Sequence, residues 1–363
     1  MSTFLLFFGI LFLLIITHEL GHFICARIFG VRVEEFGIGY PPRALLLGTW
    51  RGTEYTINWI FFGGFVRLYG EDGDAHTRGS FVSVKPWKQA TILIAGVAMN
   101  ALVAWIFFAV ALHTGLPRVI QGSLTQDPSA RLMISDVITG SPAAEAGISA
   151  GDTITRLTDQ NGVTLSVLTP EAVSDYVKVR GGQEITIDYI HLKQAHSTSL
   201  VPANAVIPGS AATPALGIGL VEVSTVALGW PDALVQGLSN TGDKFDTVLM
   251  SLWQLITGIF HGNASLQNVV GPIGLVSVVG SAAQNGAGSV LALAGFIAVN
   301  LTIINLIPIP ALDGGRLLIV AVEAVMRRKS PALVIQVLNT IGIALIILLM
   351  ITVSYHDIAR LLA

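Results

Sequence analysis

The residues best suited to chemistry are His18, Glu19 and His22, which form an H-E-x-x-H pattern in the second half of an apolar segment. Histidines four positions apart share one face of a helix, so both imidazoles can reach the same metal ion. Glu19 lies on the neighbouring edge of that face, where a carboxylate can act as a general base. Because ionisable groups are costly inside an apolar span, the pattern favours a metal site over a set of structural polar residues.

A third metal ligand is expected from another apolar segment, because two protein ligands leave a zinc site one short of the usual three plus water. Asp313 follows a long apolar run that Pro308 and Pro310 interrupt, and backbone freed in this way can open a polar cavity. Asp313 could also cap a helix that starts at Gly314, and the two roles are compatible. The single cysteine, Cys25, excludes an internal disulfide and a Cys-rich zinc site.

Three further polar residues accompany these segments. Asn305 lies eight residues before Asp313, where its amide can hold a peptide carbonyl near the metal or form a hydrogen bond across helices. Asn100 follows Gly96 at a spacing that favours close packing of two helices. Glu323 is a weaker candidate ligand, and we expect it to be solvated.

The composition indicates a polytopic membrane protein. Of the 363 residues, 52% are hydrophobic and 12% are charged, whereas roughly 25% are charged in an ordinary soluble protein. The net charge of -3 leaves no basic excess to neutralise phosphates, so nucleic-acid binding is not expected. A helix needs about 20 apolar residues to cross a bilayer. The expected spans are residues 1–29, 90–112, 290–315 and 332–353.

The first span is not expected to be a cleaved signal peptide, because no positive charge precedes Phe4 and no small-residue cleavage site follows the apolar run. Lysine and arginine concentrate in residues 26–88 and 316–331, which places these segments in the cytoplasm. Residues 113–289 and both termini are then expected outside.

The cytoplasmic loop, residues 30–89, contains an alternating apolar pattern at 53–69 around Gly63 and Gly64. This pattern predicts a β-hairpin whose turn is the glycine pair. The apolar density of residues 59–65 favours a hairpin that dips toward the membrane, and an ordinary soluble hairpin fits equally well. A substrate helix must be unwound before cleavage, and pairing it as a strand with residues 53–69 would achieve this.

The outer segment has two parts. Residues 120–205 have the composition of a small soluble α+β domain, with strands expected at 135–139, 152–157 and 184–189 and a helix at 170–179. Residues 206–289 are expected to hold a linker, an amphipathic surface helix at 230–262 and a Gly-rich apolar segment at 269–283 that is re-entrant or interfacial.

Four motifs resemble the site-2 protease family of intramembrane metalloproteases, most closely its bacterial regulator-of-sigma-E branch. They are HELGH at 18–22, GVRVEEFGIGY at 30–40, NWIFFGGFVRLYGE at 58–71 and NLIPIPALDGGRLL at 305–318. The resemblance implies zinc bound by His18, His22 and Asp313, with Glu19 as the catalytic base. It also implies a substrate-holding role for Asn305 and a membrane-inserted, substrate-binding strand that includes Gly63, Gly64 and Phe65.

A fifth motif, SPAAEAGISAGDTITRL at 141–157, resembles the signature of PDZ domains. It implies one extracytoplasmic PDZ domain that binds a peptide or filters substrates by size, because residues 208–228 are too few for a second. The family resemblance further implies a multi-pass protein embedded in the lipid bilayer of the bacterial cytoplasmic (inner) membrane. Its substrates would be single-pass membrane proteins, such as an anti-sigma factor or a signal-peptide remnant, and its cut the second in regulated intramembrane proteolysis.

Two other functions explain the pattern less well. A catalytically silent scaffold that displays a PDZ domain has no need of Glu19 beside two in-register histidines. A metal transporter normally requires polar residues along several spans, whereas residues 90–112 and 332–353 offer little beyond Asn100, Asn339 and Thr340. Metal-assisted hydrolysis of an amide bond is therefore the predicted reaction.

Overall fold

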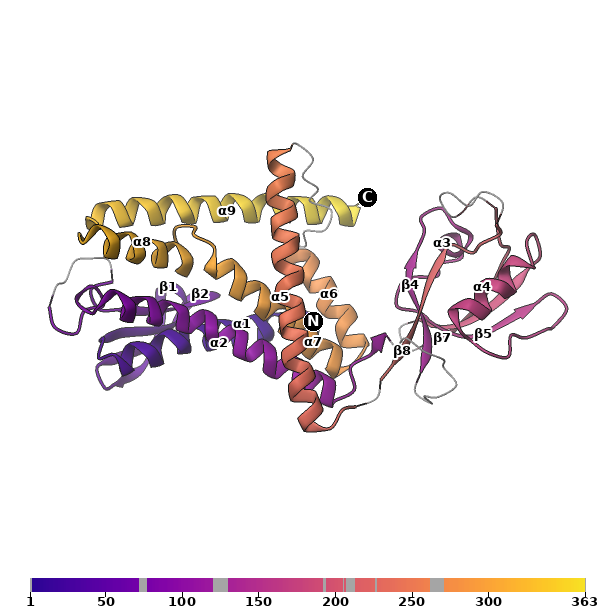
Figure 1. The fold of residues 1–363 in the computed structure, drawn as a ribbon, viewed down its shortest axis with the longest axis horizontal. Coiled ribbons are helices and arrows are strands. Elements are labelled where there is room, and N and C mark those ends of the chain that lie inside the picture. Colours follow the sequence, from indigo (N-terminus) through magenta and orange to yellow (C-terminus); the bar gives the residue numbers. More distant parts are fainter. Residues whose placement is uncertain are drawn as a thin grey trace. The chain divides into compact units, whose positions relative to one another are not determined.

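The computed structural model describes residues 2–71, 77–119, 130–191, 194–204, 206, 213–225, 227–261 and 271–362. The chain divides into two compact units, Met1–Leu112 with Gly229–Ala363 and His113–Leu228. We call the first the helical unit and the second the sheet unit (Figure 1).

Long helices dominate the helical unit, as expected from its apolar composition. They are α1 (Ser2–Ile28), α2 (Pro86–His113), α5 (Trp230–Phe260), α6 (Pro272–Gln284), α7 (Ala287–Leu306), α8 (Asp313–Met326) and α9 (Ala332–Leu362), with a short 3-10 helix at Phe81–Ser83. Four of these helices are long and apolar enough to cross a membrane, namely α1, α2, α7 and α9. Four apolar helices are thereby confirmed, although the third ends at Leu306 and not at residue 315.

The backbones of α1 and α2 are in close contact near the H-E-x-x-H pattern. A Cβ atom added to Gly21 of α1 would lie 2.3 Å from the carbonyl oxygen of Ala95 on α2. Only a glycine allows this approach, because real Cβ atoms do not come so close to a backbone oxygen. The segment that carries the H-E-x-x-H pattern therefore lies directly against the middle of α2.

A short non-helical segment, residues 307–312, separates α7 from α8. The helix ends at Leu306 because Pro308 and Pro310 cannot continue its hydrogen-bond ladder. Asp313 is the first residue of α8 and Leu312 is the N-cap, so the alternative role of Asp313 as a helix N-cap is wrong. A Cβ atom on Gly314 would lie 2.3 Å from the Leu306 carbonyl oxygen, which shows how tightly the start of α8 packs against the end of α7.

The link between α8 and α9 buries Glu323, so our expectation that it would be solvated is wrong. Its carboxylate accepts hydrogen bonds from Lys329 Nζ at 3.0 Å and from the Ser330 amide at 2.8 Å. The chain reverses at Arg327, which has a left-handed φ of 52°, and this reversal folds the link back over α8. Burial alone would raise the pKa of Glu323, but the Ser330 amide and the Lys329 charge together lower it.

The far end of α9 is attached to α6. Asp357 is buried, and its carboxylate accepts hydrogen bonds from the amides of Gly271 at 3.1 Å and Gly274 at 2.9 Å. These amides belong to the N-cap and first turn of α6, where backbone donors have no partner within the helix. Asp357 therefore caps a helix far from it in sequence.

Residues 53–69, predicted to form a hairpin by themselves, are instead one strand, β2 (Thr53–Leu68), which pairs with β1 (Val33–Trp50). The chain reverses at Arg51 and Gly52, whose φ angles of 52° and 78° suit a type I′ turn. The expected turn at the glycine pair is wrong because β2 runs through it. Gly63 instead lies against the ring of Tyr40, and Gly64 lies against α1, so both glycines permit close contact.

The register of this hairpin gives it four pairing segments. Residues 33–38 pair with 64–68 on one side and with 54–57 on the other, while 45–50 pair with 53–57. Residues 64–68 are therefore an outer segment of the sheet, and they are the part of β2 that contacts Ile15 and Glu19 of α1.

The sheet unit is a six-stranded antiparallel sheet in the order β3-β8-β4-β5-β6-β7. Its strands are β3 (Arg118–Val119), β4 (Arg131–Val137), β5 (Thr153–Asp159), β6 (Ile185–His191), β7 (Gln194–Leu200) and β8 (Ile218–Ser224), and its helices are α3 (Pro142–Glu145) and α4 (Pro170–Lys178). The predicted strands and helix are present here. Residues 218–224, expected within a linker, instead form a strand paired with β4.

The remaining predicted elements are partly described. The amphipathic segment 230–262 is the helix α5, and residue 262 lies outside the described residues. The Gly-rich apolar segment 269–283 is largely the helix α6, with residues 269–270 outside the described part of the chain. The re-entrant or interfacial position of this segment stays a prediction, as does the placement of α5 on the outer surface.

Candidate metal centre

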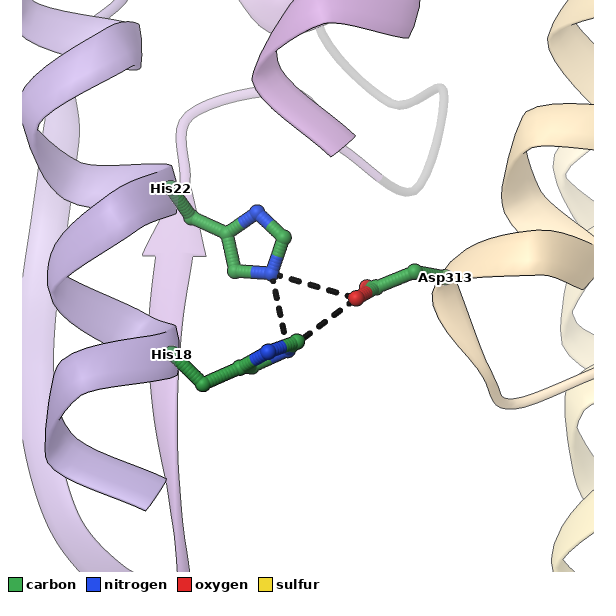
Figure 2. A group of neighbouring side chains, drawn as sticks. All are labelled: His18, His22 and Asp313. Carbon is green, nitrogen blue, oxygen red and sulfur yellow. Dashed lines mark hydrogen bonds and ion pairs between the residues drawn. The ribbon is translucent and has the colours of Figure 1, made fainter. Parts of the chain in front are cut away.

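Three side chains meet where the sequence predicts a metal (Figure 2). His18 and His22 project from successive turns of α1, and Asp313 reaches them from the start of α8. The Nε2 atoms of His18 and His22 lie 3.0 Å and 3.3 Å from Asp313 Oδ2, and the two Nε2 atoms are 3.1 Å apart. The structure therefore brings together ligand atoms from both ends of the chain.

This donor set fits zinc. Ligands at about 2.0–2.1 Å from a tetrahedral ion lie about 3.3 Å from one another, which is close to the observed spacings. Oδ2 of Asp313 is buried and accepts no well-directed hydrogen bond from the residues that the structure describes. Two imidazoles and one carboxylate that converge in this way are ligands typical of a catalytic zinc site, which keeps its fourth position open.

The helix α2 orients the imidazole of His22 from behind. His22 Nδ1 lies 2.8 Å from the carbonyl oxygen of Ile92, which can only accept a hydrogen bond. In the neutral imidazole the proton therefore resides on Nδ1, and Nε2 has a free lone pair that can bind a metal.

Gly96, one turn further along α2, provides the space for this ring. A Cβ atom at Gly96 would lie 2.3 Å from His22 Nε2 and 2.5 Å from its Cε1. The imidazole therefore lies directly against the backbone of α2 at this position.

Glu19 lies beside the cluster and contacts the hairpin. The backbone amide of Val66 in β2 lies near its carboxylate. A Cβ atom at Gly64 would lie 3.4 Å from Glu19 Cγ and 3.0 Å from Ile15 Cγ2. The outer segment 64–68 thus passes directly beside the predicted catalytic base.

The structure places the other predicted residues as follows. Asn305 is half-buried in the last turn of α7, just before the break that leads to Asp313. Gly63 lies against Tyr40, and the ring of Phe65 covers Gly37. These contacts explain local packing, and substrate binding by Asn305, Gly63, Gly64 and Phe65 stays a prediction.

The Ile92 carbonyl was not predicted from the sequence, and Gly96 and Asn100 were expected only to let two helices pack closely. Asn100 was expected only to pack helices, yet its amide nitrogen lies 3.3 Å from His18 Nδ1. Their spacing of four residues was the available signal, because it places all three on one face of α2.

Comparison with known proteins identifies the family. The description "Peptidase family M50" matches residues 6–349. The chain belongs to peptidase family M50. A "Putative zinc metalloprotease CPE1693" from Clostridium perfringens is 31% identical to it over 95% of both chains. A "Zinc metalloprotease RasP" from Oceanobacillus iheyensis is 28% identical over 99% of this chain and 98% of its own.

This M50 peptidase is therefore a zinc metalloprotease, and its four apolar helices make it a multi-pass membrane protein. The second domain of the listeria protein Lin2157, solved in solution, covers 28% of the M50 peptidase at 26% identity, with a TM-score of 0.21. A TM-score this low does not show that the two folds are the same, so the PDZ domain stays a prediction.

Proposed function

We propose that this M50 peptidase cleaves membrane-spanning segments of other proteins within the bilayer, with His18, His22 and Asp313 as its zinc ligands. The observation that carries the proposal is the convergence of three ligand atoms, 3.0–3.3 Å apart, contributed partly by a helix that can cross the membrane. A protease needs no such depth for soluble substrates. Intramembrane ionisable groups, in contrast, are expected to serve chemistry at that depth.

Glu19 is the proton carrier in this proposal. Zinc, when bound, supplies Lewis-acid polarisation of the scissile carbonyl and lowers the pKa of water to about 7. Glu19 takes the proton from the attacking water and later delivers it to the leaving amine. The Val66 amide lies near the Glu19 carboxylate and can stabilise it between these two transfers.

The outer segment 64–68 is proposed to bind the unwound substrate as an added strand. The carbonyls of a helical substrate are occupied by its own hydrogen bonds, so the helix must open before attack. Strand addition supplies replacement main-chain partners. The proposal is supported by the closeness of this segment to the predicted base, since a Cβ atom at Gly64 would lie 3.4 Å from Glu19 Cγ.

The sheet unit is proposed to be a single PDZ domain on the outer side of the bacterial cytoplasmic membrane. Its bound partner would be an extracytoplasmic peptide or protein. In this role it would restrict entry to substrates already shortened by another protease, so that the M50 peptidase makes the second cut. Candidate substrates are single-pass membrane proteins, for example an anti-sigma factor or a signal-peptide remnant.

The decisive experiment compares wild type, Glu19→Gln and His22→Ala on a model transmembrane substrate in detergent, with zinc content measured in parallel. We expect Glu19→Gln to retain zinc and lose turnover, and His22→Ala to lose both. The matched control is Glu34→Gln, which neutralises an exposed carboxylate on β1. Full turnover by Glu19→Gln would disprove its role as base, and an unchanged zinc content of His22→Ala would remove it as a ligand.

Strand addition is tested by disulfide cross-linking in the inactive Glu19→Gln background, with Cys25→Ala to remove the native thiol. A cysteine at Arg67, on the outer segment, should cross-link to cysteines placed along the substrate. A cysteine at Thr49, on the opposite outer segment, is the control because it is also exposed. Equal cross-linking at both positions would contradict strand addition at 64–68.

A further inference from the structure

One face of α2 carries a row of three groups that contact the predicted zinc ligands. Ile92, Gly96 and Asn100 follow one another at intervals of four residues, so they lie on successive turns. The Ile92 carbonyl and Gly96 hold the imidazole of His22. Asn100 stands at the end of the row, opposite His18.

Asn100 is buried, and its amide is close to His18. Only 1% of the residue is exposed, and its Nδ2 atom lies 3.3 Å from His18 Nδ1. Its Oδ1 atom is also buried and has no hydrogen-bond partner among the described residues. An unpaired buried amide oxygen costs about 1–3 kcal/mol, which a residue needed only for packing would not have to bear.

The two ends of this amide correspond to two tautomers of His18. When the NH2 group faces Nδ1, that nitrogen accepts the hydrogen bond and Nε2 carries the ring proton. When the oxygen faces Nδ1, the proton resides there and Nε2 has a free lone pair. Since Nε2 is the atom that faces Asp313 and His22, only the second arrangement allows His18 to bind zinc. A half turn about the Cβ–Cγ bond exchanges the two ends without altering the shape of the side chain.

We propose that Asn100 is a positioning residue whose carboxamide oxygen accepts the Nδ1 proton of His18 and so holds the tautomer that binds zinc. It does for His18 what the Ile92 carbonyl does for His22. Unlike that carbonyl, the amide can rotate and present a donor to His18 when no metal is bound. The inference rests on the proposed role of His18 as a zinc ligand.

The test measures zinc affinity by chelator competition in the full-length protein, together with the visible absorption of the cobalt-substituted form. The variants are Asn100→Leu, which removes the acceptor, and Asn100→Asp, which keeps it. The matched control is Gln89→Leu, because Gln89 is another fully buried amide of α2 that bonds only to the carbonyls of Phe81 and Val84 in the described structure. Melting temperatures without metal report any general loss of packing.

We expect Asn100→Leu to bind zinc about 10- to 100-fold more weakly, the usual effect of losing a hydrogen bond behind a ligating histidine. Its cobalt spectrum should change, whereas Gln89→Leu should keep wild-type affinity and spectrum at a lowered melting temperature. Asn100→Asp should bind zinc at least as tightly as wild type, since a carboxylate is an acceptor only.

The inference is overturned if Asn100→Leu keeps the affinity and spectrum of wild type, or if Asn100→Asp binds zinc more weakly. Weaker zinc binding by Asn100→Asp would overturn the inference even if Asn100→Leu does not fold, because it would show that His18 needs the NH2 group. Failure of the proposed function has a different signature. In that case His18→Ala and His22→Ala would both retain zinc.

Discussion

Gly96→Ala tests whether the backbone of α2 sets the position of His22. The new methyl group would lie 2.3 Å from His22 Nε2, whereas carbon and nitrogen atoms in contact are about 3.4 Å apart, so the ring must retreat by about 1 Å. Metal–ligand distances tolerate only about 0.2 Å. If α1 and α2 separate instead, His18 moves with His22, so every relief of the clash displaces a ligand.

We expect the zinc affinity and the turnover of Gly96→Ala each to fall by about 100-fold or more, since a 1 Å misplacement costs rates on that order. Such a loss corresponds to about 2.7 kcal/mol. The direction opposes helix propensity, because replacing glycine by alanine within a helix should stabilise it by about 1 kcal/mol. A general gain in helix stability therefore cannot imitate the predicted result.

The assay combines chelator competition for zinc, cleavage of a model transmembrane substrate and thermal unfolding of the metal-free protein. Gly9→Ala is the matched control, because it makes the same change in α1 at a position with open space around it. It should leave zinc affinity and turnover as in wild type. Wild-type affinity and turnover in Gly96→Ala would refute the view that His22 is held against the backbone of α2.

Two further predictions concern the ends of α9. Because the folded-state pKa of Glu323 is lowered, its contribution to stability is present above the unfolded pKa of about 4.3 and disappears as the pH falls through the folded value. Glu323→Gln should therefore lower the melting temperature at pH 7, and its difference from wild type should shrink once the pH falls below about 4; a constant difference would count against the charge. Asp357→Ala leaves two amides of α6 without an acceptor and should cost about 1–3 kcal/mol of unfolding free energy. The exposed Asp246→Ala is its control, and equal melting temperatures would contradict a capping role.

The ligand cluster was predictable from the sequence because its signals reside in side-chain types and local spacing. His18 and His22 share a helix face, and the two prolines before Asp313 correctly predict the end of the preceding helix. The support given by α2 was not predictable in the same way. The Ile92 carbonyl belongs to the backbone, so no side-chain type in the sequence indicates its role. Gly96 contributes by lacking a Cβ atom, which leaves space for the His22 ring.

The predictions for the Gly63–Gly64 pair, for Glu323 and for residues 218–224 were wrong because each depends on contacts with residues distant in the sequence. A glycine pair indicates either a turn or a close approach, and at Gly63–Gly64 only the contacts with Tyr40 and α1 distinguish the two. The charge of Glu323 predicts exposure to solvent. The hydrogen bonds from Lys329 and Ser330 that compensate its burial form only because the link between α8 and α9 folds back over α8. Long-range pairing likewise decides that residues 218–224 are a strand of the sheet unit.

The order of ligands along the chain has a consequence for synthesis. His18 and His22 leave the ribosome early, together with Glu19, but Asp313 follows only after α7 and the proline break. Until α8 packs against α1, a growing chain holds the predicted base and two of the predicted ligands but not the third. We therefore expect the chain to be inert while it is inserted beside other newly made membrane helices, and to become a protease only when its own assembly is nearly finished.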